Sequence, residues 1–309
     1  MAAMDGNTFS PLAIFFLFVF EMESIVSLLG NGFIMVVNGY GWLQSKKMLP
    51  CDFLLTTLSL SRFLRQWVSM SSQFVYFSSS DVYSKKLQLL IFSWIYLNIA
   101  SLWCVTWLNV FYCVKVTNFA HPLFARLKLR IGAWMPRCLG ISLLAFIICS
   151  VHPVMRCFED EKCRNLTGNL PEKTSESGAQ GNFAVSLLQI AFTAISFGLC
   201  VSASVLLLVS LWKHTRNLKK SGLSTKDLGT QAHLKVIKPL LFLLVFYILH
   251  FAAMIIAFTN ILWFGKHAWL ISDIVLSFYP SVHSVILIFT NPKLKKAYIH
   301  IINFRRRAS

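Results

Sequence analysis

Seven long apolar stretches dominate this chain and constrain its fold more than any other feature. They lie at approximately 12–40, 53–76, 87–114, 132–151, 183–211, 236–261 and 269–290, with polar or basic segments between them. A helix needs about 20 apolar residues to cross the hydrocarbon core of a bilayer. The runs are continuous rather than alternating, which excludes the strands of a membrane β-barrel. The sequence therefore predicts seven transmembrane helices.

Composition agrees with a membrane protein. Hydrophobic residues make up 56% of the chain and charged residues only 13%, whereas soluble domains carry about 25% charged residues. We expect an all-α membrane protein in which residues 1–309 form a single seven-transmembrane-helix bundle, with 291–309 as a short basic cytoplasmic tail. The net charge of +17 is explained by basic cytoplasmic loops, so the expected partner is the lipid bilayer and not a nucleic acid.

The distribution of basic residues orients the bundle. Segments 44–52, 115–130, 212–238 and 291–309 together hold 19 Lys and Arg residues. The segments at the other ends of the spans, 1–11, 77–86, 152–182 and 262–268, hold 7. Cytoplasmic loops are the basic ones, so the N-terminus is predicted outside and the C-terminus inside. The glycosylation sequon at Asn165 falls in a predicted outer loop, which agrees with this orientation.

Cysteine usage points away from metal chemistry. Six of the eight cysteines lie in or beside apolar stretches, where cysteine usually behaves as a small hydrophobe. Only Cys157 and Cys163 share a polar loop. There is no CxxC pair or histidine cluster, and we predict no metal and no other cofactor.

Several ionisable residues fall inside the predicted spans. They are Glu21 and Glu23 in the first span, Arg62 and Arg65 in the second, and Asp273 in the seventh. Such residues are costly at membrane depth and usually face the bundle interior. We therefore expect them to meet one another, or other polar groups, between the helices.

Arg62 is too deep in its span to reach water comfortably and must have partners inside the bundle. Asn31 in the first span and Ser281 or Ser284 in the seventh are the candidates. Such a polar cluster of Asn31, Arg62 and Ser284 could fix helix packing, or act as a switch that repacks on activation, and the two roles are compatible. A proton relay is a third alternative.

The predicted outer ends of the third and seventh spans carry aromatic and polar residues together. Trp94 and Asn98 are one helical turn apart and share a face, and Asp273 lies four residues after Trp269. Tryptophan alone could belong to an interfacial aromatic belt. Aromatic walls with a few polar groups are typical of small-molecule pockets, so the four residues are predicted to bind ligand.

Six short stretches follow one another in a specific order along the chain. They are GNGFI at 30–34 with Glu23 before it, LSLSRF at 58–63, FYCVK at 111–115, SLWKHT at 210–215, TQAH at 230–233, and HSVILI at 283–288 followed by NPKLK at 291–295. Together they resemble the bitter taste receptors, the type 2 taste receptor family of G-protein-coupled receptors. In that family, FYxLKIxxF stands where rhodopsin-like receptors have a DRY motif.

The resemblance implies a receptor and not an enzyme. A small bitter agonist would enter a pocket near Trp94, Asn98 and Asp273 from the extracellular side. A gustducin-like or inhibitory heterotrimeric G protein would bind the opposite face, which the resemblance places at Lys115, His214, His233 and Lys235. The expected location is the plasma membrane, with multiple passes.

Two features depart from the family pattern. Arg65 occupies a place where the family usually has an apolar residue, and Glu21 or Glu23 is the nearest candidate to pair with it. The outer end of the third span has no cysteine, so the common disulfide of rhodopsin-like receptors cannot form there. We hypothesise instead that Cys157 and Cys163 pair with each other, because they lie close together in an oxidising loop.

Two alternatives remain open at the level of sequence. The first is another chemosensory receptor with seven spans, such as a type 1 vomeronasal receptor, which the HSxxLI and FYxxK motifs disfavour. The second is a membrane transporter or channel, suggested by the buried charges. Transporters often contain internal repeats with paired broken helices, and this sequence shows no such repeat.

Overall fold

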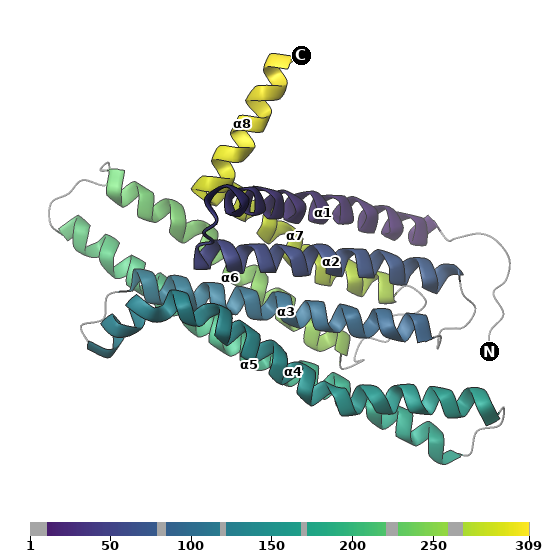
Figure 1. Ribbon diagram of the computed structural model, residues 1–309. Coiled ribbons are helices and arrows are strands. Elements are labelled where there is room, and N and C mark those ends of the chain that lie inside the picture. The colour runs from purple at the N-terminus through teal and green to yellow at the C-terminus, as the bar shows by residue number, and fades with distance from the viewer. Residues whose placement is uncertain are drawn as a thin grey trace.

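The fold consists of long helices. The computed structural model describes residues 11–78, 85–117, 122–167, 172–220, 228–258 and 268–308, and the regular secondary structure in these ranges is helical throughout (Figure 1). The helices are α1 (Pro11–Ser45), α2 (Pro50–Ser78), α3 (Lys85–Val116), α4 (Pro122–Thr167), α5 (Glu172–Lys220), α6 (Leu228–Phe258), α7 (Ala268–Thr290) and α8 (Pro292–Ala308).

Helices α1 to α7 form one bundle with α3 at its centre. Helix α3 packs against α2, α4 and α5, while α1 packs against α2 and α7, and α6 lies between α5 and α7. Residues 98–106 of α3 are buried without interruption, as expected for a helix surrounded on all sides. Helix α8 leaves the end of α7 and projects away from the bundle (Figure 1). We call this end of the bundle the α8 end and the opposite one the far end.

Six of the described helices are long and apolar enough to cross a membrane, namely α1 and α3 to α7. Helix α2, which covers the second predicted span, is not among them. It is more polar because it carries Arg62, Arg65 and Gln66, and each of these side chains is at most 1% exposed. The polar residues of α2 therefore face the bundle interior, while seven spans and the sides of the termini stay predictions.

Helix ends are set by local chemistry. Lys46 follows α1 with a φ of 54°, and its N–H donates to the carbonyl of Trp42 at 2.8 Å. This left-handed residue closes the helix in the manner of an αL cap. At α8, the side chain of Asn291 accepts from the N–H of Lys293 at 3.0 Å, and Pro292 occupies the first helical position, where its missing N–H costs nothing.

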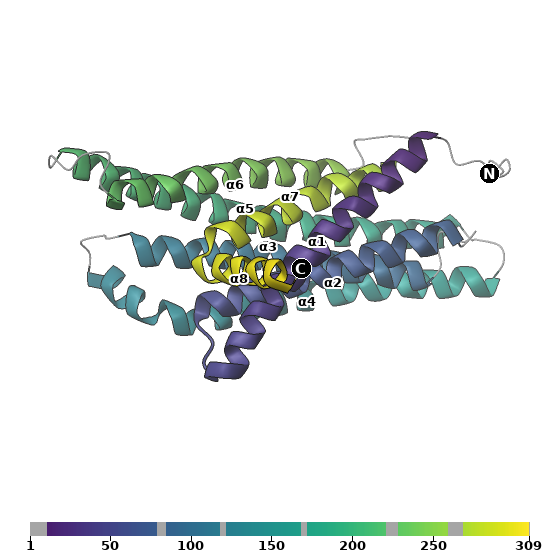
Figure 2. The ribbon, with the colours of Figure 1, turned by 90° about the horizontal axis from the view of Figure 1, so that it is seen from above.

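A close contact joins α1 to α7. Helix α1 crosses the other helices obliquely (Figure 2), and Gly30 lies against Ser284 of α7. A Cβ atom placed at Gly30 would lie 2.7 Å from the Ser284 Oγ. Any larger residue at position 30 would force Ser284 to shift, so glycine allows the two helices to approach as they do.

Candidate functional site

Polar side chains, all but one of them buried, gather inside the bundle between α1, α2, α3, α6 and α7. We call this set the polar core. Its members are Glu23, Ser24, Asn31, Arg62, Arg65, Gln66, Ser69, Gln73, Asn98, Ser101, His250, Asp273, Ser277, Ser281, His283 and Ser284. Burial of polar groups is costly unless they find partners, so the hydrogen bonds of the polar core show what holds it together.

Arg62 lies nearer the α8 end and is hydrogen-bonded to two other helices. Its Nε donates to the Oγ of Ser101 on α3 at 3.1 Å. Its Nη1 donates to the carbonyl of Pro280 at 3.4 Å and lies 2.9 Å from the Nδ1 of His283, both on α7. With Nη1 as the donor, the Nδ1 of His283 is the acceptor. The Arg62 guanidinium also lies 5.7 Å from the ring centre of Tyr279, within the range of a cation–π contact. Arg62 therefore connects α2, α3 and α7.

Arg65 lies one turn further toward the far end and has a different environment. Its guanidinium is centred 6.0 Å from the ring of Trp94 on α3. The carboxylates of Asp273 and Glu23 act on its charge, yet none of its three nitrogens has a hydrogen-bond partner among the residues that the structure describes. Arg65 thus has an aromatic ring and two carboxyl groups nearby, but no hydrogen-bond partner among the described residues.

Asp273 is held by α2 rather than by Arg65. Its Oδ2 accepts a short hydrogen bond from the Oγ of Ser69 and a second from the Nε2 of Gln73 at 3.2 Å. The side chain is buried. Hydrogen bonds to an ionised acceptor are among the stronger ones in proteins, so Ser69 and Gln73 fix the position of the carboxylate on α7.

A second link ties α1 into the polar core. Gln66 of α2 donates to the Oγ of Ser24 at 2.7 Å, and Ser281 of α7 donates to an oxygen of Glu23 at 3.3 Å. Glu23 is therefore the acidic residue of α1 that faces the interior, whereas Glu21 is exposed. Helix α1 thereby contributes a carboxyl group to the surroundings of Arg65.

The partners of Arg62 differ from those expected. Asn31 donates to the carbonyl of Ser27 in its own helix at 2.9 Å, and Ser284 donates to the carbonyl of Ser281 at 2.8 Å. Small polar side chains readily donate to the preceding turn of their own helix, and the acceptor Oδ1 of Asn31 has no hydrogen-bond partner among the described residues. The expectation that Asn31, Ser281 or Ser284 would bond to Arg62 was wrong, although all three are buried near it in the polar core.

The true partners of Arg62 carried only weak sequence signals. Ser101 lies three residues after Asn98 and therefore shares a face with it, and His283 opens the HSVILI stretch. Ser69 and Gln73, which hold Asp273, lie one and two turns beyond Arg65 on α2. No local pattern distinguished them from other polar residues of that helix.

The structure brings three of the predicted ligand-binding residues to the far half of the bundle. Trp94 is half-buried beside Arg65. Asn98 is buried and its Nδ2 donates to the Sδ of Met254 on α6 at 3.2 Å. Asp273 lies across from them on α7, and the side chain of Trp269 lies outside the described residues. Together these residues connect α3, α6 and α7 next to Arg65.

A separate groove of about 550 Å³ opens between α2 and α3. Its lining consists of Leu64, Trp67, Val68, Phe92, Ser93, Tyr96 and Leu97. Trp67 is half exposed, so the groove faces outward from the bundle. It does not include the predicted ligand-binding residues and is distinct from the polar core.

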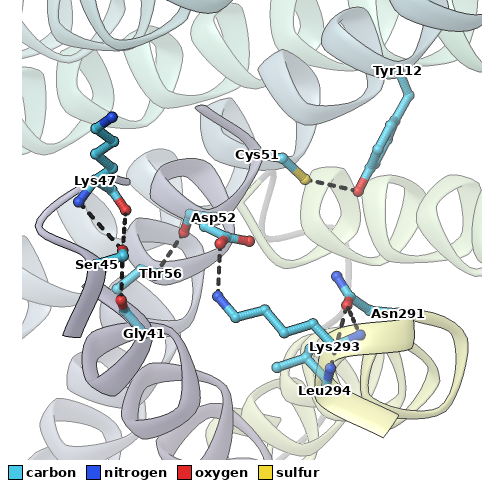
Figure 3. A network of polar contacts seen from close by, with 10 residues as sticks. All are labelled: Gly41, Ser45, Lys47, Cys51, Asp52, Thr56, Tyr112, Asn291, Lys293 and Leu294. Carbon is cyan, nitrogen blue, oxygen red and sulfur yellow. Dashed lines mark hydrogen bonds and ion pairs between the residues drawn. The ribbon is translucent and has the colours of Figure 1, made fainter. Parts of the chain in front are cut away.

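Polar contacts at the α8 end fix the start of α8 against α2 (Figure 3). The Nζ of Lys293 pairs with the Oδ2 of Asp52 at 2.7 Å. The Sγ of Cys51 lies 3.1 Å from the hydroxyl of Tyr112 on α3. These contacts join α2 to α3 and to α8 at the basic end of the bundle.

The residues predicted to face a G protein belong to the same end. Lys115 is exposed in the last turn of α3, where a cation interacts favourably with the helix dipole, and its Nζ lies 6.0 Å from the ring centre of Phe111. The side chains of His214, His233 and Lys235, in α5 and α6, lie outside the described residues. The same holds for the side chains of Asn165, Cys157 and Cys163 in α4, so glycosylation and the disulfide stay predictions.

Comparison with known proteins identifies the family. The family model for taste receptor protein (TAS2R) matches residues 9–306. Taste receptor type 2 member 41 of Pan paniscus is 32% identical over 302 residues, which cover 96% of this chain and 98% of the relative. Taste receptor type 2 member 8 of Homo sapiens is 30% identical over 308 residues, covering 97% and 99%.

These matches run through α1 to α8 and include both arginine-bearing and ligand-predicted segments. They favour the receptor interpretation over the vomeronasal and transporter alternatives, because the whole chain and not a single motif is matched. The chain belongs to the type 2 taste receptors, the bitter taste receptor family of G-protein-coupled receptors.

Proposed function

We propose that this chain binds small bitter compounds from the extracellular side and activates a heterotrimeric G protein of the gustducin or inhibitory type. The proposal rests on family membership along nearly the whole chain. In this proposal the ligand binds beside the polar core, and the G protein binds at the basic α8 end. It requires no enzymatic step, because a ligand that binds one conformation better than another shifts the populations of the two.

The proposed topology places the far end outside the plasma membrane and the α8 end in the cytoplasm. The count of basic residues supports this orientation. Helix α2 completes seven spans, because its buried arginines face other helices rather than lipid. Lys115, His214, His233 and Lys235 would then be available to the G protein.

The observation that carries the proposed pocket is that Trp94 and Asp273 both lie near Arg65, while Asn98 lies one turn from Trp94 on α3. An agonist near these residues would contact α3, α6 and α7 together, since Asn98 already joins α3 to α6. The same α7 carries Pro280 and His283, which bind Arg62 toward the α8 end. A ligand-dependent shift of α7 would therefore change the contacts of Arg62.

Removal of Trp94 or Asn98 tests the pocket. In cells that co-express a gustducin-like chimeric G protein, an intracellular calcium signal is measured against a panel of chemically varied bitter compounds. Trp94→Ala and Asn98→Ala should each weaken the agonist response roughly tenfold, the shift that 1.4 kcal/mol produces. Surface expression should persist.

Trp67→Ala is the matched control, because Trp67 is an exposed tryptophan of the outward-facing groove. It should leave the dose–response curve unchanged. Unchanged curves for both pocket variants would reject this pocket. A wild-type receptor that reaches the surface and answers none of the compounds would count against agonist sensing as such.

A further inference from the structure

Arg65 is the buried cation whose hydrogen-bonding capacity is left unused by the described protein. It is 1% exposed, and its Nε, Nη1 and Nη2 have no partner in the part of the chain that the structure describes. A buried polar group without a partner loses its hydration and gains nothing in exchange, and the loss is larger for a charged group. A buried charge without hydrogen bonds is therefore expected where it serves a function other than stability.

The surroundings of Arg65 do not supply the missing acceptors. Trp94 presents an aromatic ring to the guanidinium, which attracts the cation but offers no lone pair. Asp273 is within electrostatic range, but its Oδ2 is bonded by Ser69 and Gln73. Glu23, also in range, receives a hydrogen bond from Ser281 on its Oε1, and its Oε2 has no hydrogen-bond partner among the described residues, so it does not bond to Arg65 either.

A purely structural role would use Arg65 differently. A cation that only neutralises two carboxylates is expected to pair with one of them through the planar fork of the guanidinium. Here one oxygen of each carboxyl group is held by another side chain, and the N–H groups of Arg65 bond to neither of them. The charge of Arg65 is thus balanced at longer range, while its donors stay free for an acceptor that is not part of the described protein.

We infer that Arg65 is the recognition point for an oxygen acceptor of the agonist, such as a carbonyl, sulfonyl or carboxylate oxygen, with an aromatic body packed beside Trp94. The inference rests on the proposed agonist pocket. It names the chemical class that this pocket takes, and it makes Arg65 a specificity residue.

A matched series of naphthalene compounds tests the inference. The probes are naphthamide, naphthoate, naphthylmethylammonium and methylnaphthalene, which share one aromatic body and differ in the polar group. Calcium responses and the thermal stability of the purified receptor are measured for the wild type, Arg65→Leu and Arg65→Lys. In Arg65→Leu, potency for naphthamide and naphthoate should fall about tenfold or more, as expected for loss of a charge-assisted hydrogen bond.

The other ligands and the lysine variant test whether the effect depends on the polar group of the ligand. Methylnaphthalene should act on the wild type and on Arg65→Leu alike, because it makes no hydrogen bond. Arg65→Lys should restore part of the naphthamide response, since lysine keeps the charge and the donors but loses the planar fork. A preference of the wild type for naphthylmethylammonium would overturn the inference, because it would assign recognition to Asp273 or Glu23 instead.

The failure of this inference can be distinguished from failure of the pocket. If Arg65→Leu leaves every response unchanged while Trp94→Ala removes them, the pocket stands and the role of Arg65 is rejected. An equal loss of all four responses in Arg65→Leu at normal surface expression would also reject it, because a structural role would not depend on the polar group. A wild type that responds to the bitter panel but binds none of the four probes rejects the proposed ligand class and leaves the pocket standing.

Discussion

The surroundings of the two buried arginines of α2 differ sharply although they lie one turn apart. Arg62 reaches Ser101 on α3 and His283 on α7 with distances of 3.1 and 2.9 Å. Arg65 is equally buried, but within the described chain its neighbours are the ring of Trp94 and two carboxylates that other side chains hold. One arginine connects helices directly, and the other is balanced only by charge and an aromatic face.

The difference shows that burial alone does not define the role of a charged residue. Both arginines lose their hydration, but only Arg62 regains directional hydrogen bonds to uncharged acceptors. Removing one partner from a buried hydrogen-bonded charge leaves the other groups unsatisfied, which is strongly destabilising. We therefore expect Arg62 to matter mainly for stability and Arg65 mainly for ligand choice, and the following predictions test that contrast.

The largest effect is expected from Arg62→Leu. This change leaves Ser101, His283 and the carbonyl of Pro280 without their partner in the bundle interior. Each unsatisfied buried group costs about 1–3 kcal/mol, so the total loss is a large share of the roughly 5–15 kcal/mol that stabilises a typical domain. The fraction of receptor at the cell surface, and the melting temperature of the solubilised receptor, should both fall steeply.

Arg65→Leu is the internal control for that measurement. It removes an equally buried cation from the same helix, but no short hydrogen bond to the described residues is lost. Its melting temperature should fall less than that of Arg62→Leu. If the melting temperatures of the two variants fall equally, the proposed distinction between a structural Arg62 and a ligand-recognising Arg65 is wrong.

An intermediate effect is expected at the contact between α1 and α7 that lies beside the Arg62 region. In Gly30→Val the new side chain collides with Ser284, since even a Cβ would lie 2.7 Å from its Oγ. Overpacking of this kind costs about 1–3 kcal/mol, and thermal melting of the solubilised receptor measures it.

Gly39→Val is the matched control, because a Cβ at Gly39 would meet no atom within 4 Å. Both changes replace glycine by the same β-branched residue in the same helix, so the intrinsic helix propensity cancels. A loss of stability at Gly39 as large as that at Gly30 would show that the helix itself, and not the contact with α7, is responsible.

The smallest effect is expected at the exposed ion pair of the α8 end. Lys293 and Asp52 are 2.7 Å apart, but the lysine side chain is 40% exposed. Exposed pairs contribute about 0–1 kcal/mol. A double-mutant cycle with Asp52→Asn and Lys293→Met, followed by thermal melting, should give a coupling within that range, and a coupling of several kcal/mol would contradict the distinction between buried and exposed charges.

The sequence predicted the helices well because their signal is local. All seven apolar stretches lie within described helices or overlap them, since length and continuous hydrophobicity suffice to identify such segments. Burial of Arg62 also followed from its depth in the second stretch. Helix α2 alone among the seven fell short of the apolar character of a membrane span, because the residues that serve the polar core reduce its hydropathy.

The candidate site was predicted only in part. Trp94 and Asn98 could be placed on one face because they are one turn apart in the same helix. Ser69 and Gln73 were missed, because their role depends on Asp273, which lies about 200 positions further along the chain. The predicted partners of Arg62 were wrong for a related reason. A small polar side chain can bond to its own helix or to another helix, and sequence spacing does not show which of the two bonds forms.

By itself, the sequence determined the family, the helical segments, the basic end of the chain and the presence of buried charge. These properties arise from neighbours in sequence or from motifs in fixed order. Only the tertiary structure decided that Arg62 is hydrogen-bonded to α3 and α7, and that Arg65 lies near Trp94 without a hydrogen-bond partner among the described residues. Those outcomes depend on which side chains from α1, α3, α6 and α7 meet α2, and the packing of distant segments is what sets hydrogen-bond distance and direction.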